Sequence, residues 1–264
     1  MSKFKYSTYL INLERSTDRL ELMKKEFSKS NLTFERISAI DAKNLKGDEY
    51  FINNKYDRDL LGGEIGCYLS HVNTLQKFLN SDNDFALIIE DDAMLPENLK
   101  HSVEEVMDQY DDLSTKHRWD VLKLNSRRRY IKIKDVKNTD LFIGACGTSI
   151  PITTIAAIWT RKGAEKFLKV CLAKGKPEIK RPIDCELQHP WEYDLLIYNL
   201  LPSLITNFPV ESEIQLDLSK RKAELFRQIK YELNRLFPKY NYYIKQHGFK
   251  TFFNNFFWKK TDKL

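Results

Sequence analysis

The chain has 264 residues, of which 42% are hydrophobic and 30% charged, with a formal net charge of +6. This length and composition predict a soluble globular protein with one sizeable domain, and the lack of any run of about 18 apolar residues argues against a membrane-spanning helix. The first residues lack the apolar core of a signal peptide, which predicts a cytoplasmic protein. Four widely separated cysteines match no zinc-site spacing, so we expect reduced thiols.

The first strand and helix are predicted near the N-terminus. Residues 6–13 have the pattern of a strand, and Ser16 is placed to cap the helix that follows. Asn12, Arg15 and Arg19 lie between or just inside these elements. The two arginines suit phosphate and the asparagine suits a base or ribose. The alternative is a surface ion-pair network with the neighbouring acids.

A glycine-rich helix start follows a second short strand predicted at 34–40. The segment LLGGEIGCYLSH, residues 60–71, opens a helix and contains Glu64, Ser70 and His71. A glycine-rich helix start can approach a phosphate or sugar closely, although this one lacks the Gly-Lys-Ser/Thr ending of a Walker loop. His71 suits either a structural hydrogen bond or a role as ligand or acid-base group.

Three adjacent carboxylates follow the most apolar strand of the chain. Residues 86–89 are uninterrupted by charge, which is typical of a strand covered on both faces, and Glu90, Asp91 and Asp92 come directly after. Open α/β sheets bind ligands beyond the carboxyl ends of their strands. Alternation along the strand places Glu90 and Asp92 on one side, where they can hold a divalent cation. The alternative is a solvated acidic turn.

The second half continues the alternation. Strands are predicted at 119–124 and 153–160, and the first is followed by Arg127, Arg128 and Arg129, which can contact phosphate. Asp184 follows Arg181-Pro182-Ile183 at the expected start of a helix. It fits a helix cap and equally a general base whose position is fixed by the helix terminus.

The C-terminal segment differs in character from the rest. Residues 219–264 hold 12 Lys and Arg against 3 Asp and Glu, whereas residues 1–218 hold 31 against 34. An amphipathic helix is predicted from Leu225 to Phe237, where Pro238 stops it. Phe249, Phe252, Phe253, Phe256 and Phe257 then form a stripe framed by lysines, the pattern of a helix in a membrane interface. The alternative is a helix packed on the body. We therefore predict a domain at 1–215 and a basic, aromatic-rich helical tail at 216–264.

Four motifs in order, YLINLERSTDR, FERISAID, LLGGEIGCYLSH and ALIIEDDA, resemble the signature of glycosyltransferase family 25 of bacterial lipooligosaccharide biosynthesis. The resemblance is strong over residues 6–95, and TTIAAIWTRKGAEKFL and RPID extend it more weakly. It implies an α/β fold of the GT-A type, with a Rossmann-like nucleotide-sugar-binding domain around a central mixed, mostly parallel sheet and a C-terminal helical extension.

The resemblance also implies an inverting enzyme that uses a UDP-sugar and a divalent metal, often Mn2+. Glu90, Asp91 and Asp92 stand where the family has its version of the Asp-x-Asp motif. Asp92 is then the expected metal ligand with Glu90, while Glu90 or Asp91 lies near the ribose or a metal-bound water. The residues matched to the donor pocket are Asn12, Arg15, Arg19, Glu64, Ser70 and His71. Asp184 is the expected catalytic base.

The expected function is transfer of a hexose, galactose from UDP-galactose, to a sugar hydroxyl of a lipooligosaccharide or similar surface glycan, as a beta-galactosyltransferase on the inner face of the cytoplasmic membrane. UDP-glucose or a UDP-N-acetylhexosamine is the alternative donor. A metal-dependent phosphohydrolase or nucleotidyltransferase can use the same acids. A third reading, a module whose aromatic tail grips nucleic acid, is disfavoured because the aromatic residues keep helical spacing on one face. We therefore expect no nucleic-acid partner.

Overall fold

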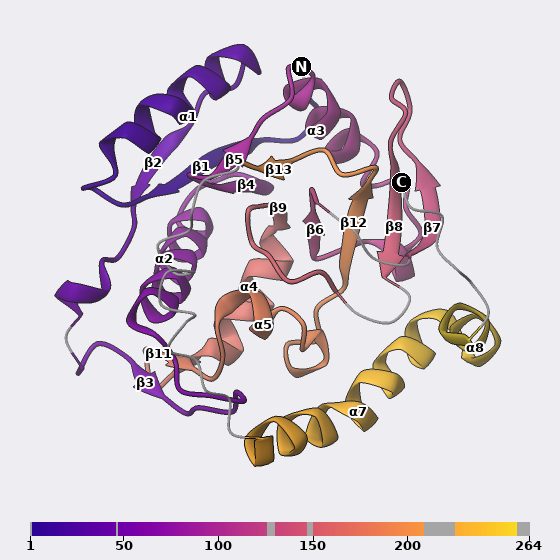
Figure 1. The fold of residues 1–264 in the computed structure, drawn as a ribbon. Helices are drawn as coiled ribbons and strands as arrows, with labels where there is room; N and C mark the ends of the chain where they lie inside the picture. The colour runs from indigo at the N-terminus through magenta and orange to yellow at the C-terminus, as the bar shows by residue number, and fades with distance from the viewer. Residues whose placement is uncertain (1, 46, 126–129, 147–149, 209–224, 258–264) are drawn as a thin grey trace.

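The computed structural model describes residues 2–45, 47–125, 130–146, 150–208 and 225–257. Its centre is an eight-stranded sheet with the order β2-β1-β4-β9-β6-β12-β8-β7 (Figure 1). In that order the strands are Glu35–Ser38, Tyr6–Asn12, Phe85–Glu90, Ala156–Thr160, Val121–Lys123, Ile197–Leu201, Phe142–Cys146 and Tyr130–Asp135. Two small sheets join β10 (Leu172–Ala173), β11 (Lys176–Ile179) and β3 (Phe51–Ile52), and β13 (Thr206–Asn207) with β5 (Ala93–Met94).

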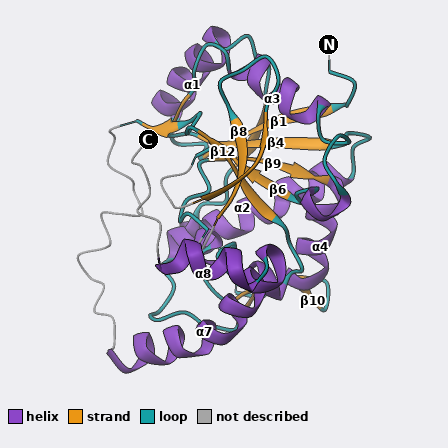
Figure 2. Ribbon diagram, turned by 90° about the vertical axis from the view of Figure 1, so that its right-hand side faces the viewer, coloured by secondary structure: helices purple, strands orange, loops and turns teal. Residues whose placement is uncertain are grey.

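Helices cover both faces of the large sheet, and Figure 2 shows the resulting three layers. On one face lie α1 and α3, and on the other α2, α4 and the C-terminal helices. The helices are α1 (Thr17–Lys29), α2 (Gly62–Leu79), α3 (Leu99–Asp108), α4 (Arg161–Cys171), α5 (Ile183–Glu186), α7 (Leu225–His247) and α8 (Phe249–Phe257).

The strand β4 runs through the middle of this core. Its side chains alternate between the two layers: Ala86 and Ile88 pack with α2, whereas Phe85, Leu87 and Ile89 pack with α1 and α3. All five are at most 2% exposed. The continuous apolar run therefore reflects burial on both faces, as the sequence predicted.

The expectation of a mostly parallel sheet is wrong. Three of the seven pairings are parallel and four are antiparallel. The strand β9 lies antiparallel between β4 and β6, and β8 joins β12 and β7 by antiparallel pairs. A strand buried on both faces reads as the same apolar run in either direction, so the composition of β9 does not reveal its orientation.

The expected helix end at Pro238 is also wrong, because α7 continues through this proline to His247. A proline removes one backbone hydrogen bond from a helix interior. The turns that follow are held by the body: Tyr243 is 2% exposed within the core, and the Tyr242 hydroxyl donates to the carbonyl of Leu195 at 2.9 Å. Tertiary packing therefore compensates for the lost bond.

The C-terminal stripe of phenylalanines is divided between core and solvent. Phe252 is 7% exposed and packs in the core cluster, whereas Phe249 and Phe253 are 67% and 41% exposed. The alternative of packing on the body thus describes part of this segment. The proposed boundary at residues 215 and 216, like the arginines at 127–129, lies outside the described residues, and both stay predictions.

We predict that Gly163→Ala destabilises the protein. A Cβ atom added at this position would clash with the carbonyl oxygen of Asp120. The Gly163 amide donates to the Thr160 hydroxyl at 2.9 Å, which caps α4. The backbone on both sides is held, so we expect a loss of about 1–3 kcal/mol in the free energy of unfolding. Urea denaturation measures it. Glu165→Ala, at an exposed site on the same helix, should change it by less than about 0.5 kcal/mol. Equal stability of Gly163→Ala and the wild type contradicts the prediction.

Candidate active site

The carboxyl ends of three strands bring polar residues to one edge of the sheet. The strands β1 and β4 are parallel, with Ile11 opposite Glu90, and β6 has the same direction because both β4 and β6 pair antiparallel with β9. Asn12, Glu90 and Lys123 are the last residues of β1, β4 and β6. The edge that sequence reasoning selected therefore collects groups from separate parts of the chain.

Glu90 is held by a histidine. His71, from α2, places Nε2 2.9 Å from Glu90 Oε1 and is 4% exposed. Burial alone opposes ionisation of Glu90, but hydrogen bonds from His71 and Thr154 and the charge of Lys123 hold its pKa below the ordinary value. His71 thus supports the carboxylate directly.

Asp91 accepts two hydrogen bonds that hold the loop following β1 in place. Asn12 Nδ2 donates to Asp91 Oδ2 at 2.6 Å, and an Arg19 guanidinium nitrogen donates to Oδ1 at 3.0 Å. Arg15 forms an ion pair with Asp41. Asn12 and Arg19 therefore contact the acidic motif directly, whereas Arg15 contacts a different carboxylate, that of Asp41.

Asp92 has one satisfied and one unsatisfied oxygen. Asn207 Nδ2, from β13, donates to Oδ2 at 2.9 Å, while Oδ1 is buried without a hydrogen-bond partner among the described residues. Burial, together with the charges of Glu90 and Asp91, raises the pKa of Asp92 to about 6. A buried oxygen without a donor fits a divalent cation, because carboxylates are preferred ligands of Mg2+ and Mn2+.

Asp184 joins the same electrostatic cluster. It lies in the first turn of α5, whose N-cap residue is Pro182, so Asp184 is not the helix cap; its Oδ1 accepts a hydrogen bond from the amide of the next residue, Cys185, at 2.7 Å. Burial raises the pKa of Asp184, and the negative charge of Glu90 raises it further. The hydrogen bond from Cys185 and the positive charge of Lys123 oppose this rise. The charge of Lys123 thus lowers the pKa of both Asp184 and Glu90, and the charge of Glu90 raises that of Asp184, although the three residues are far apart in the sequence.

Lys123 is the buried cation of this cluster. It is 1% exposed, and its Nζ donates to the carbonyl of Pro151 at 2.5 Å. Burial lowers its pKa to about 8, although the charges of Asp184 and Glu90 act in the opposite direction. Sequence reasoning missed Lys123. Its signal is the lysine between two leucines in the predicted buried strand WDVLKL, because a buried lysine requires a partner.

Glu64 and Ser70 make structural contacts at the glycine-rich helix. Glu64 accepts from the Leu61 amide at 2.9 Å and from Arg58 at 2.8 and 2.5 Å. The Ser70 hydroxyl donates to Gly66 and accepts from the Ile40 amide at 2.8 Å. These bonds fix the start of α2 and the chain after β2, and a direct contact with the donor stays a prediction.

A second grouping of ligand atoms lies beside the acidic motif. One atom each from Cys67, His71 and Glu90 lie within 4.8 Å of one another. Burial and the charges of Glu90 and Asp184 raise the pKa of the Cys67 thiol well above its usual value. A protonated thiol is a poor metal ligand, so the oxygens of Glu90 and Asp92 match a cation better.

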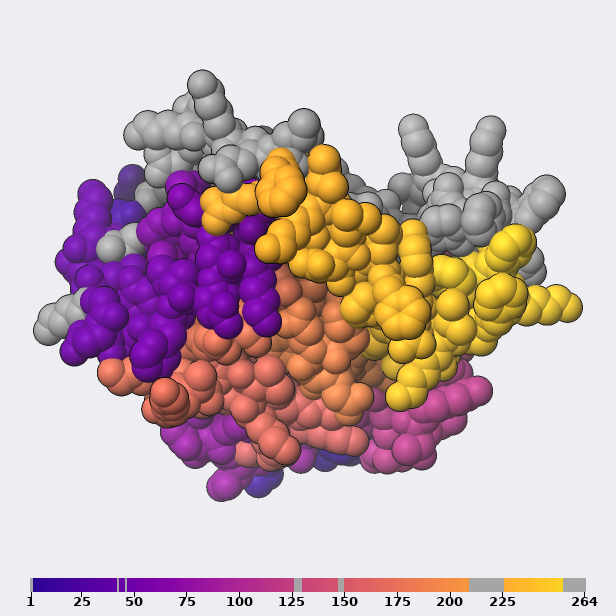
Figure 3. Space-filling view, turned by 90° about the horizontal axis from the view of Figure 1, so that it is seen from below, coloured from indigo at the N-terminus to yellow at the C-terminus, as the bar shows by residue number. Residues whose placement is uncertain are grey.

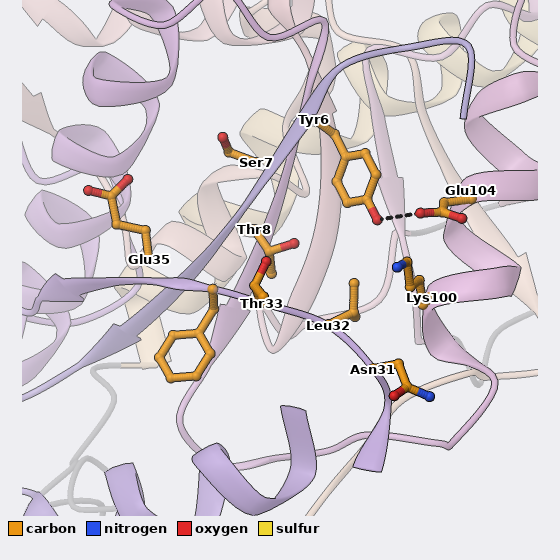
Figure 4. Close-up of a pocket in the computed structure, with 10 residues that line it drawn as sticks. Tyr6, Ser7, Thr8, Asn31, Leu32, Thr33, Glu35, Lys100 and Glu104 are labelled. Atoms are coloured by element: carbon orange, nitrogen blue, oxygen red, sulfur yellow. Dashed lines mark hydrogen bonds between the residues drawn. The ribbon is translucent and has the colours of Figure 1, made fainter. Parts of the chain in front are cut away.

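A different pocket lies at the other end of β1. It has a volume of about 400 Å3 and is lined by Tyr6, Ser7 and Thr8 at the start of that strand, together with Lys100 and Glu104 (Figure 4). The Tyr6 hydroxyl donates to Glu104 at 3.0 Å across it. Because Asn12 ends the strand and Tyr6 begins it, this pocket is separate from the edge of the sheet that carries Glu90, Asp91 and Asp92, which we call the acidic edge.

Comparison with known proteins identifies relatives. The family model described as glycosyltransferase family 25 (LPS biosynthesis protein) matches residues 5–185. Procollagen galactosyltransferase 1 of Danio rerio is 23% identical over 216 residues, which cover 75% of this chain and 35% of the relative. The lipooligosaccharide biosynthesis protein lic2B of Haemophilus influenzae is 38% identical over 92 residues, 34% of this chain and 35% of the relative. A Haemophilus influenzae protein named "Putative glycosyltransferase" is 28% identical over 268 residues, 92% of this chain and 88% of the relative. The matches thus span about a third of the first two relatives and most of the third.

We predict that Asp92→Asn stabilises the metal-free protein at high pH. The folded-state pKa of Asp92 is about 6, above the ordinary value of 3.8, so its favourable contribution is complete below pH 3.8 and is lost as the pH rises through 6. A difference of two pKa units corresponds to about 3 kcal/mol. Urea denaturation with a chelator should therefore show the variant more stable than the wild type by up to that amount at pH 8 and nearly equal at pH 4.

The control is Asp82→Asn, at an exposed position before β4. Its effect should be small and similar at both pH values. An Asp92→Asn variant whose stability follows the wild type at both pH values would show that Asp92 does not lie in a buried carboxylate cluster.

Proposed function

The chain belongs to glycosyltransferase family 25, and we propose that it transfers galactose from UDP-galactose to a sugar hydroxyl of a lipooligosaccharide or similar surface glycan. The observation that carries this proposal is the carboxylate cluster at the carboxyl edge of the sheet, where the charge of Glu90 acts on both Asp92 and Asp184 and the charge of Lys123 acts on Glu90 and Asp184. The names of two relatives, a procollagen galactosyltransferase and a lipooligosaccharide biosynthesis protein, support the donor and the acceptor class. Helices on both faces of a mixed sheet are compatible with the GT-A type, which we include in the proposal.

Asp92 and Glu90 are the proposed ligands of a divalent cation, Mn2+. The buried oxygen of Asp92 without a donor and the raised pKa of this carboxyl support the assignment. A bound cation at this place supplies positive charge that stabilises a departing diphosphate. His71 holds Glu90 in position, and Asn207 holds the second oxygen of Asp92.

The donor loop supplies the remaining contacts to the nucleotide. Asn12 and Asp91 lie together at the end of β1, where we place the ribose. Arg15 and Arg19 each contact a carboxylate of the protein, and the diphosphate offers these guanidinium groups an alternative partner with more negative charge. Glu64 acts on the pocket by fixing the start of α2, and Ser70 by holding the chain that follows β2.

Asp184 is the proposed general base. A sugar hydroxyl is a weak nucleophile at neutral pH, so its proton must pass to a carboxylate as its oxygen attacks the anomeric carbon. Attack from the face opposite UDP inverts that carbon and turns an α-linked donor into a β-galactoside. The positive charge of Lys123 acts on both Asp184 and Glu90 and offsets the repulsion between these two carboxylates.

We also propose that the protein acts on the inner face of the cytoplasmic membrane as a peripheral protein. No helix in the described ranges is long and apolar enough to cross a bilayer. One face of α7 exposes Phe226, Leu233 and Phe237, which are 77%, 62% and 80% exposed, and the segment around them is basic. An exposed apolar face with lysines alongside suits an anionic membrane surface. We therefore assign the membrane contact to this face of α7 and not to the phenylalanine stripe of α8, which is partly buried.

A donor panel tests the catalytic proposal. With Mn2+, we expect slow hydrolysis of UDP-galactose, transfer to a deacylated lipooligosaccharide, and little turnover of UDP-glucose or UDP-N-acetylhexosamines. A chelator and Asp92→Asn should abolish both activities. Asp184→Asn should lower transfer by about 10²–10⁴-fold and keep binding of UDP-galactose. Asp82→Asn is the control. Release of phosphate or nucleotide from every UDP-sugar, independent of acceptor, would favour the phosphohydrolase instead.

Vesicle co-sedimentation tests the membrane proposal. The triple variant Phe226→Ser, Leu233→Ser, Phe237→Ser should bind vesicles rich in anionic lipid at least about tenfold more weakly than the wild type, because apolar burial contributes roughly 0.8 kcal/mol per CH2 group. The matched control is Phe51→Ser, Ile52→Ser, which removes two exposed apolar side chains from β3. Equal losses in the two variants, or equal binding to neutral vesicles, contradict the proposal.

A further inference from the structure

A pocket separate from the acidic edge lies between α7 and the body. It has a volume of about 640 Å3, and its walls come from the segment 54–56, from the residues flanking α5 and from α7. Figure 3 views this side of the molecule, with the orange and yellow C-terminal helices lying against the purple and salmon parts of the chain. The C-terminal segment therefore forms one wall of a cavity on the catalytic domain.

Three buried nitrogen atoms of pocket-lining residues have no hydrogen-bond partner within the described part of the chain. They are Arg181 Nε, His189 Nε2 and Arg235 Nε. Arg181 is 4% and His189 is 2% exposed. A buried polar atom that is left unpaired loses its hydrogen bonds to water without replacement, and such atoms in a native structure point to a missing partner. Three around one pocket indicate a ligand with several polar groups.

The histidine is set to accept a hydrogen bond. Its Nδ1 lies 2.8 Å from the carbonyl of Cys185, so Nδ1 carries the hydrogen and donates. Burial, with the charge of Arg181, lowers the pKa of His189 to about 3. The ring is therefore neutral, and Nε2 offers a lone pair to a donor such as a sugar hydroxyl.

The arginines and lysines give the pocket an excess of positive charge. Lys55, Arg181, Arg227, Lys230 and Arg235 line it, and Glu192 is the one acid among its lining residues. The three arginines have acidic partners, Glu186 and Glu192 for Arg181, Asp59 for Arg227 and Glu232 for Arg235. Lys55 and Lys230 have no ion pair with any described residue. An anionic group on the ligand would balance them.

Aromatic rings form the remaining recognition surface. His189 lies with its ring centre 5.1 Å from that of Trp191 and 5.7 Å from that of Tyr231. Tyr and Trp present a broad apolar face with a polar edge, which suits the apolar face of a pyranose ring. Flat aromatic surface, a hydroxyl acceptor and unpaired cations together match a charged sugar better than a free ion.

The pocket lies next to α5, the helix that carries the proposed base. Arg181 and His189 flank α5, whose Asp184 belongs to the acidic cluster, while the Cys185 thiol donates to the Tyr56 hydroxyl at 3.3 Å on the pocket side. We propose that this pocket binds a sugar that carries a phosphate or a carboxylate, a neighbour in the acceptor glycan of the sugar that receives galactose. This inference rests on the proposed function and adds the charge of the acceptor to it.

Direct binding tests the proposal without catalysis. Glucuronic acid, glucose 6-phosphate, glucose and inorganic phosphate are titrated into the full chain, free of UDP-sugar, and followed by calorimetry or ligand-observed NMR. At least one charged sugar should bind, and at least about tenfold more tightly than both glucose and inorganic phosphate. Which charged sugar binds better tells whether the group is a carboxylate or a phosphate. Equal binding of glucose, or of phosphate alone, overturns the proposal.

Two variants of α7 locate the binding. Lys230→Glu reverses an exposed charge that lines the pocket, and Lys245→Glu reverses an exposed charge on the same helix outside the pocket lining. Lys230→Glu should weaken binding of the charged sugar at least about tenfold and raise the acceptor KM, whereas Lys245→Glu should do neither. Equal effects of the two variants overturn the proposal. Binding without turnover of any UDP-sugar would instead contradict the proposed function, and turnover without binding would contradict this inference alone.

Discussion

Repulsion between buried carboxylates is the constraint around which the carboxyl edge of the sheet is built. The charge of Glu90 raises the pKa of both Asp92 and Asp184, and charges of like sign in a poorly solvated place cannot persist without compensation. The compensation comes from separate elements: His71 from α2, Lys123 from β6 and Asn207 from β13. Each of these elements must therefore be in place before the site exists.

The antiparallel strand β9 makes this convergence possible. It lies between β4 and β6 and pairs with both, so it sets the register of Lys123 relative to Glu90. On the other side of β4, the pairing with β1 brings Asn12 to Asp91. The acidic motif at the end of one strand is thus held from both neighbouring sides of the sheet.

Local patterns in the sequence predicted the elements and the acidic edge, because a short apolar run ending in acids has few other placements in an α/β protein. They did not predict the direction of β9, since burial on both faces erases the periodicity that would distinguish orientations. The continuation of α7 past Pro238 depends on Tyr242 and Tyr243 packing on the body, a tertiary effect. Lys123 was visible as a charge in an apolar strand, but its partners lie too far away in the chain for spacing to reveal them.

The helix α7 stands outside residues 5–185, the part of the chain that matches the family model. It nevertheless forms a wall of the basic pocket beside α5, while the acidic edge is assembled almost wholly from residues within the matched part. Substitutions on the inner face of α7 can therefore alter that cavity without disturbing the carboxylates or the loop after β1. With the acceptor role that we propose for this pocket, exchanging the C-terminal helix between relatives becomes a route to new acceptor ranges that leaves the proposed donor site in place.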